Sequence, residues 1–164
     1  MTGMLGQMKR KILITGGMGF VGGRLAQSLT SHGDTEVILG SRKKHTSLSW
    51  LSNAKVVVID WGSEKSLISA CQEVDVIVHL AAMNDAECLN DPALALQVNA
   101  VNTVRLLQVA KAMGVKRVIY FSTAHVYGPS LAGPIHEATL PKGRHPYACL
   151  LYTSDAADDL LRVY

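Results

Sequence analysis

The chain of 164 residues lacks the features that mark exported, metal-binding and membrane proteins. Its three cysteines are odd in number and have no CxxC spacing, which indicates free thiols in a reducing cytosol rather than disulfides or zinc. The six histidines stand singly, without an HxxxH pair, so no metal is expected. The apolar runs, residues 56–59 and 76–82, have the length of strands, and the three apolar residues after Lys11 are too few for a signal peptide. We therefore expect a cytoplasmic protein with no membrane partner.

The chain also lacks a strong excess of positive or negative charge. The formal net charge is +3, and the basic clusters at 9–11 and 42–44 are too short, with too few aromatic neighbours, to indicate nucleic-acid binding. What the chain does have is 48% hydrophobic residues, enough for one globular domain with a sizeable core.

Apolar segments of strand length alternate with helical patterns along the chain. Residues 1–8 contain Gly and Met without a period and are expected to be disordered. A helix that begins after Asp91 has Asp at the N-cap, Pro92 at its first position and Gly114 at its end. The expected strands are 11–15, 36–39, 55–59, 74–80 and 118–122, and the expected helices are 20–31, 64–71 and 91–113. Strands without an alternating polar face, separated by helices, indicate an α/β fold with a doubly wound parallel sheet.

A glycine-rich segment lies between the first strand and the first helix. Gly16 permits a tight turn, Gly19 lets a pyrophosphate approach the backbone, and Gly22 lets the helix pack closely on the sheet. The amino end of the helix offers N–H groups and a partial positive charge to phosphates. A glycine pattern alone also marks ordinary turns, but the strand before it and the helix after it favour a dinucleotide site.

Several motifs together resemble the extended short-chain dehydrogenases/reductases, and more narrowly the NAD-dependent epimerase/dehydratase group that acts on nucleotide sugars. The motifs that carry the resemblance are ITGGMGFVG at 14–22, HLAA at 79–82, Asn99, FSTAHVYG at 121–128 and Pro146-Tyr147. The resemblance covers about residues 10–148. It implies a Rossmann fold, a cofactor-bound hydride transfer at a sugar carbon, a nucleotide-sugar substrate, a homodimeric parent protein and a second, C-terminal substrate domain. The cofactor-binding residues that it implies are Gly16, Gly17, Gly19, Phe20, Val21, Gly22, Ser41, Arg42, Asp60, Leu80, Ala81, Ala82, Asn99 and Tyr147.

The residues after the second expected strand bear on the choice of dinucleotide. NAD-binding Rossmann folds place an acidic residue there to bind the ribose 2′-hydroxyl, whereas this chain has Ser41 and Arg42 and no carboxylate. A hydroxyl and a guanidinium suit a 2′-phosphate, so we expect NADP in preference to NAD. Arg42 and Lys43 could instead only solvate a loop. Asp60 resembles the position that meets the adenine, although a turn role is the alternative.

The resemblance assigns catalysis to Thr123 and Tyr147. In the family the Tyr transfers a proton at the substrate oxygen, and a Lys four residues later lowers its pKa and holds the ribose. Asn99 resembles the asparagine that organises the site, with a helix-surface position as the alternative. Some dehydratases carry Asp-Glu after the Thr, where this chain has Ala124 and His125, which argues for epimerase or reductase chemistry rather than 4,6-dehydration. His125 is an alternative acid or a loop residue without a role.

The family pattern ends after residue 148. Leu151 stands where the lysine should follow Tyr147, and residues 150–161, LLYTSDAADDLL, resemble the translation of a sequencing-library adapter. We therefore expect three parts: a disordered 1–8, an NAD(P)-binding Rossmann domain over 9–148, truncated before the substrate domain, and an artefactual tail over 149–164. The alternative is a natural divergent helix, capped by Ser154.

Two classes of function remain open from the sequence. One is the cofactor-binding part of a nucleotide-sugar epimerase or reductase, inactive alone because Leu151 cannot supply an ammonium group. The other is a non-catalytic dinucleotide sensor, although a sensor has no chemical need for Thr123 and Tyr147. A keto-sugar reductase of the same family is a third possibility.

Overall fold

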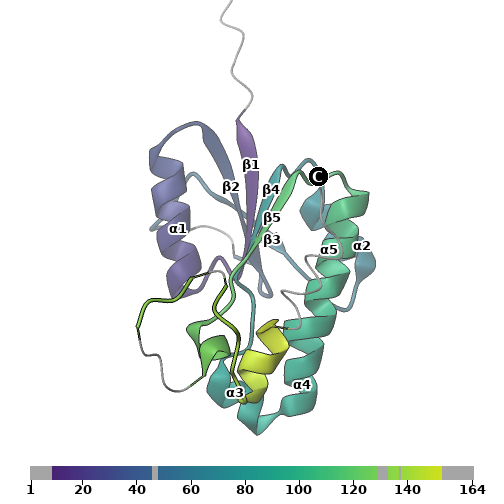
Figure 1. The fold of residues 1–164 in the computed structure, drawn as a ribbon. Helices are drawn as coiled ribbons and strands as arrows, with labels where there is room; N and C mark the ends of the chain where they lie inside the picture. Colours follow the sequence, from purple (N-terminus) through teal and green to yellow (C-terminus); the bar gives the residue numbers. More distant parts are fainter. Residues whose placement is uncertain (1–8, 46–47, 129–132, 137, 153–164) are drawn as a thin grey trace, which may run out of the picture. The chain divides into compact units, whose positions relative to one another are not determined.

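The computed structural model describes residues 9–45, 48–128, 133–136 and 138–152. The expected disorder of residues 1–8, the cap at Ser154 and residues 153–164 of the expected tail lie outside the described residues. The strands are β1 (Arg10–Thr15), β2 (Thr35–Ser41), β3 (Lys55–Val58), β4 (Val76–His79) and β5 (Arg117–Tyr120) (Figure 1). The helices are α1 (Phe20–Ser31), α2 (Glu64–Cys71), α3 (Asp85–Asn90), α4 (Pro92–Leu96), the π-helix η1 (Gln97–Val101), α5 (Asn102–Ala112) and the 3-10 helix η2 (Ala124–Tyr127). Residues 146–152 are also helical.

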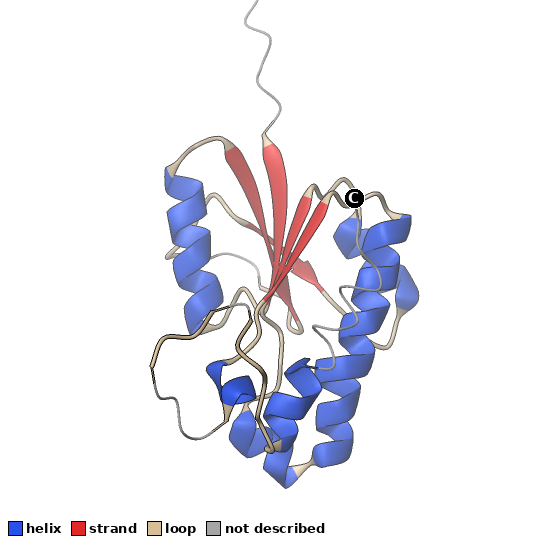
Figure 2. Cartoon of the chain, in the orientation of Figure 1, coloured by secondary structure: helices blue, strands red, loops and turns tan. Residues whose placement is uncertain are grey.

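The strands form one sheet in the order β3-β2-β1-β4-β5 (Figure 2). The pairs β1–β2, β1–β4 and β2–β3 are parallel, with Ile12 of β1 opposite both Val37 of β2 and Val76 of β4. From β1 the chain adds β2 and β3 on one side, and then returns to add β4 and β5 on the other side, so the strand order reverses beside β1. The predicted doubly wound parallel sheet is confirmed. In such sheets ligands bind beyond the carboxyl ends of the strands at the point of reversal, where β1 leads into the glycine segment.

Both faces of the central strand are buried. Ile12 and Ile14 pack with Ala26 of α1 and with Leu39 of β2 in one apolar cluster. Leu13, which points to the opposite face, is also fully buried. Because α1 and α2 lie on opposite sides of the sheet (Figure 1), the central strands need no polar face, which explains their unbroken apolar sequence.

The described residues divide into two compact units. The first contains the residues up to Leu80 together with Val109–Ile119, and it holds almost the whole sheet. The second contains Ala81–Gln108 and the residues from Tyr120 onward. Within the described part of the chain, no helix is both long enough and apolar enough to cross a membrane. Among the described residues, Cys71, Cys88 and Cys149 form no disulfide; the first two are buried and the third is exposed.

The helix expected over 91–113 is interrupted. Its start is as predicted, since Asp91 Oδ1 accepts a hydrogen bond from the N–H of Leu94 at 2.9 Å. Between α4 and α5, however, the π-helical segment η1 carries Asn99 in a fully buried position. The sequence analysis also missed α3, although a capping box marks its start: Asn84 caps the helix, and the Glu87 side chain accepts from the N–H of Asn84.

Candidate functional site

The glycine segment forms a tight turn between β1 and α1. Gly16 has φ +68°, a conformation that favours glycine, and its carbonyl accepts from the N–H of Gly19 at 2.9 Å. A Cβ at Gly22 would lie 2.6 Å from the carbonyl oxygen of Gly16, and a Cβ at Gly17 would lie 2.7 Å from Leu39 Cδ2. These positions exclude side chains because α1 packs directly on the turn and the turn packs directly on β2.

The amino end of α1 is open. Gly19 is the N-cap residue and has no side chain to accept from the first N–H groups of the helix. The side chains of Phe20 and Val21 are 80% and 52% exposed, so they do not cover this end. A twelve-residue helix with uncapped N–H groups, preceded by a turn without side chains, fits the diphosphate of a dinucleotide. Gly16, Gly17, Gly19, Phe20, Val21 and Gly22 are thus brought together as the sequence predicts.

The end of β2 carries the residues expected at the ribose. Ser41 is the last residue of the strand, and Arg42 follows it in an exposed position. The Ser41 hydroxyl accepts from the N–H of Lys43 at 3.1 Å and lies 3.2 Å from Nε2 of His45. His45 was not among the predicted site residues, and no motif in the sequence distinguishes it. The cluster contains hydroxyl, guanidinium and imidazole groups and no carboxylate.

Asp60 follows β3 at an exposed position. Its Oδ1 accepts from the N–H of Gly62 at 2.9 Å, and its own N–H donates to the hydroxyl of Ser66 at 3.0 Å. These bonds give Asp60 the turn role that the sequence left open as the alternative. A contact between Asp60 and an adenine stays a prediction.

Buried polar contacts join the carboxyl ends of β1 and β4. The N–H of Leu80 donates to the carbonyl and to the hydroxyl oxygen of Thr15, each at 3.2 Å. Thr15 Oγ1 lies 2.5 Å from Nδ1 of His79, whose side chain is 2% exposed. Burial lowers the pKa of His79 from 6.5 to about 4, so the imidazole is neutral at pH 7. His79 therefore belongs to the buried contacts between the ends of β1 and β4.

Asn99 organises the loop that follows β4. Its Oδ1 accepts from the N–H of Met83 at 2.7 Å, and its Nδ2 donates to the carbonyl of Met83 at 3.1 Å. Nδ2 also donates to Sγ of Cys88 at 3.4 Å. The Asn99 side chain is 1% exposed, so the helix-surface alternative is wrong. Asn99 fixes the main chain just beyond Ala81 and Ala82, and no direct cofactor contact is needed for that role.

Thr123 and Tyr147 lie together in the second unit. The hydroxyl oxygen of Thr123 accepts from the N–H of His125 at 3.3 Å, and the Thr123 side chain is hydrogen-bonded to that of Tyr147. Burial, the largest effect, raises the pKa of Tyr147; the Thr123 bond lowers it, and the nearby Cys88 and Asp85 raise it further. The imidazole ring of His125 meets the Tyr147 ring edge-on at 6.0 Å.

Main-chain contacts bring these two segments together. The N–H groups of Lys142 and Gly143 both donate to the carbonyl of Val126, each at 2.8 Å. A Cβ at Gly143 would lie 2.8 Å from Ala148 Cβ and equally close to the carbonyl oxygen of His125. The segment before the helix at 146–152 therefore packs directly on η2. The sequence analysis missed Gly143, because a lone glycine in a segment rich in Pro and Gly gives no sign of its partner.

Leu151 lies four residues after Tyr147 in the same helical segment. Its side chain is apolar and 1% exposed. Burial of an uncharged side chain there means that this position supplies no positive charge to the Tyr147 phenol. Within the described residues, no group of three or more His, Cys, Asp or Glu side chains is arranged to hold a metal ion.

Comparison with known proteins gives concordant matches. A UDP-N-acetyl-alpha-D-glucosaminuronate decarboxylase from Bacillus cytotoxicus is 34% identical over 127 residues, which are 74% of this chain and 39% of the decarboxylase. A GDP-6-deoxy-D-mannose reductase from Pseudomonas aeruginosa is 42% identical over 78 residues, 45% of this chain and 26% of the reductase. The solved structure of MoeE5 in complex with UDP-glucose and NAD matches with a TM-score of 0.78 and 25% identity, covering 92% of this chain and 48% of MoeE5.

The chain thus spans less than half the length of each of these proteins. The family model described as "NAD dependent epimerase/dehydratase family" matches residues 12–156, which include the glycine turn, Asn99, Thr123 and Tyr147. The chain belongs to the NAD-dependent epimerase/dehydratase family of the extended short-chain dehydrogenases/reductases.

Proposed function

We propose that this chain is the dinucleotide-binding part of an enzyme that acts on a nucleotide sugar, and that it has little or no activity alone. The observation that carries the proposal is the glycine turn, where Gly22 packs on Gly16 and the amino end of α1 is uncapped. The decarboxylase and the reductase to which the chain is similar have nucleotide-sugar names, and MoeE5 was solved with UDP-glucose. These matches support the substrate class.

Each group in the chain has a role in this proposal. The bound dinucleotide supplies the hydride acceptor or donor. The segment from Gly16 to Gly22 binds its diphosphate, and Ser41 and Arg42 bind at the ribose. Thr123 orients a substrate hydroxyl, and Tyr147 holds or donates a proton at that oxygen. Asn99 holds the main chain at Met83 in place. It also donates to Cys88, which is near enough to Tyr147 to affect the pKa of its phenol.

We propose that the dinucleotide is NADP rather than NAD. The support comes from Ser41, Arg42 and the absence of a carboxylate in the Ser41–Arg42 segment, whereas MoeE5 was solved with NAD. The test is the ratio of the two dissociation constants, measured by calorimetry on the intact chain. We expect NADP to bind more tightly, and Arg42→Gln to remove most of the difference by weakening NADP alone. Lys65→Gln in α2, an equal change of charge, should leave the ratio unchanged. Equal or tighter binding of NAD by the unaltered chain would contradict the proposal.

The proposed lack of turnover follows from the environment of Tyr147. Burial raises the pKa of its phenol, and Leu151 provides no cation to lower it, so Tyr147 stays protonated at neutral pH and little phenolate is present to act as a base. We expect no conversion of UDP-glucose, UDP-glucuronic acid or a GDP-sugar in the presence of either dinucleotide. Detection of product by chromatography, at a rate above that of Tyr147→Phe, would refute this part of the proposal.

We further propose that residues 149–164 do not belong to the natural protein. The reason is the adapter-like sequence of residues 150–161, which begins at the point where the family lysine is lost. Amplification of the source DNA and sequencing across codons 140–170 without library adapters tests this directly. A Lys codon at 151 is the expected result. A confirmed Leu codon, followed by the codons for this tail, would make Leu151 genuine.

A second candidate function is a non-catalytic dinucleotide sensor. The buried, apolar Leu151 favours it, because a sensor needs no activated tyrosine. The sensor and the enzyme fragment both bind the dinucleotide, but they differ in the response to Leu151→Lys. A gain of turnover in a protein that carries this change would support the enzyme; continued binding without turnover would support the sensor.

A further inference from the structure

A polar cavity lies at the amino ends of β1, β4 and β5, whereas the glycine turn follows the carboxyl end of β1. Its volume is about 670 Å³, and its lining includes the first residues of three strands, Arg10 of β1, Val76 of β4 and Arg117 of β5. All three strands are parallel and begin at this end of the sheet. The volume falls within the range of small-molecule sites.

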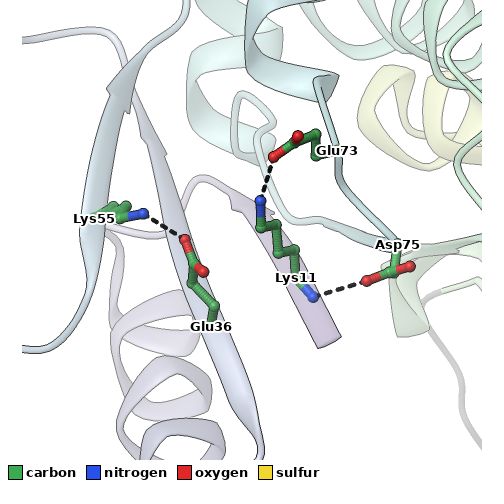
Figure 3. Close-up of polar contacts among 5 residues, drawn as sticks. All are labelled: Lys11, Glu36, Lys55, Glu73 and Asp75. Atoms are coloured by element: carbon green, nitrogen blue, oxygen red, sulfur yellow. Dashed lines mark hydrogen bonds and ion pairs between the residues drawn. The ribbon is translucent and has the colours of Figure 1, made fainter. Parts of the chain in front are cut away.

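Basic side chains predominate in this cavity. It is lined by five basic side chains and two acidic ones, a formal excess of three positive charges. The acidic ones are already paired. Glu73 accepts from Lys11 Nζ at 2.5 Å, and Asp75 accepts from the main-chain N–H of Lys11 at 2.9 Å (Figure 3). Asp75 also accepts from Lys116 Nζ at 2.7 Å. These contacts lower the pKa of both carboxyls, so the two pairs stay ionised at neutral pH and cancel.

The remaining basic side chains of the cavity are Lys9, Arg10 and Arg117. In the described part of the chain none of the three forms an ion pair. Arg10 and Arg117 begin the strands on either side of β4, and two strand spacings separate these strands by about 10 Å. Guanidinium groups on long side chains can both reach one ligand over that span, and their planar forks bind phosphate oxygens bidentately.

We propose that this cavity is a binding site for a small polyphosphate anion, separate from the dinucleotide site and held by Arg10 and Arg117 with Lys9. Such an anion carries several charges within reach of both guanidinium groups, which a single phosphate or carboxylate does not. The site goes beyond the proposed function and does not depend on it.

The test uses the intact chain and inorganic tripolyphosphate, with binding measured by calorimetry at low salt. We expect one tripolyphosphate per chain. The double variant Arg10→Gln, Arg117→Gln should weaken binding on the order of tenfold or more, and the double change to Lys should weaken it less, because charge remains but the forks are lost. Lys55→Gln is the matched control: Lys55 lies at the same end of the sheet, pairs with Glu36 at 2.6 Å and does not line the cavity (Figure 3).

Three results would overturn the proposal. The first is the absence of tripolyphosphate binding. The second is an equal loss of affinity with Lys55→Gln, which would indicate a diffuse effect of surface charge. The third is a loss of tripolyphosphate binding when the dinucleotide is saturating, which would place the anion at the glycine turn. A parallel titration with ATP identifies the source of the anion. Equal affinity indicates that inorganic polyphosphate suffices, and tighter binding indicates a nucleotide. Thermal melting of each variant confirms folding, and a failure of dinucleotide binding would leave the tripolyphosphate result intact.

Discussion

Asn99 holds both main-chain polar groups of Met83, accepting from its N–H at 2.7 Å and donating to its carbonyl at 3.1 Å. The two residues are sixteen positions apart, so this amide fixes the loop after β4 against the π-helical segment η1. A π-helical turn widens the helix locally, and such turns are frequent at functional sites.

The first prediction concerns this contact. Asn99→Leu keeps the branched shape of the side chain but leaves two main-chain groups of Met83 without their partner, and we expect the free energy of unfolding to fall by about 1–3 kcal/mol. Urea denaturation measures the change. Asn90→Ala, at an exposed position in α3, should alter stability by less than about 0.5 kcal/mol. An Asn99→Leu protein as stable as the unaltered chain would show that the Asn99–Met83 contact is not stabilising.

Two adjacent glycines of α1 should respond in opposite ways to the same change. A Cβ at Gly22 would lie 2.6 Å from the carbonyl of Gly16, whereas a Cβ at Gly23 would lie 3.5 Å from the ring of Trp50, an ordinary contact. Gly22→Ala should therefore displace the glycine turn and weaken dinucleotide binding tenfold or more. Gly23→Ala should leave binding unchanged and stabilise the helix by up to about 1 kcal/mol. Equal affinities of the two variants would contradict the packing described for the turn.

The buried His79 should make stability depend on pH. Its pKa is lowered from 6.5 to about 4 by burial, so between these values the unfolded state binds the proton and the folded state does not. Stability is therefore lost as pH falls, by about 2 kcal/mol between pH 7 and pH 5. Urea denaturation should show this loss of stability at low pH in the unaltered chain and not in His79→Gln. The variant His32→Gln, altered at an exposed histidine, should still show the loss.

His79→Gln could prevent folding, and a spectroscopic measurement on the unaltered chain avoids that difficulty. The imidazole Cε1–H resonance of His79 should not titrate between pH 8 and about pH 5. A His79 resonance that titrates near pH 6.5 would refute the description of a neutral, buried imidazole.

A lysine at position 151 should change the ionisation of Tyr147. Leu151→Lys places an ammonium group one helical turn from the tyrosine, and we expect the pKa of Tyr147 to fall. The measurement is a pH titration of the Tyr147 side chain by ¹³C NMR. Cys149→Lys adds the same charge at an exposed position two residues from Tyr147, on a different helical face, and should have a smaller effect. No difference between the two lysine variants would contradict the placement of position 151 on the same helical face as Tyr147.

Local signals in the sequence predicted much of the fold. The helices α1 (Phe20–Ser31) and α2 (Glu64–Cys71) begin and end where apolar spacing and flanking residues indicate. The ends of β4 were less accurate, because the N–H of Val74 bonds to the carbonyl of Cys71 in a turn rather than to a neighbouring strand. The π-helical segment could not be predicted, since it accompanies a side-chain contact with a loop sixteen residues away.

The candidate site likewise has a part that the sequence predicts and a part that it does not. The glycine turn is predictable because its constraints, a left-handed Gly16 and a close approach at Gly22, act between residues only six positions apart. The junction of Gly143 with His125 and Ala148 joins segments far apart in sequence, and no local pattern indicates it. The cluster of His45 with Ser41 depends on the path of the loop after β2, which the sequence did not specify.

The proposed function depends on binding of a nicotinamide dinucleotide at the glycine turn. Calorimetric titration of the intact chain with NADP, and separately with NAD, tests it most directly, with Gly22→Ala and Gly23→Ala measured alongside. We expect saturable binding of one dinucleotide per chain, which Gly22→Ala weakens and Gly23→Ala does not. A folded chain that binds neither dinucleotide, or that binds one equally well in both variants, would contradict it.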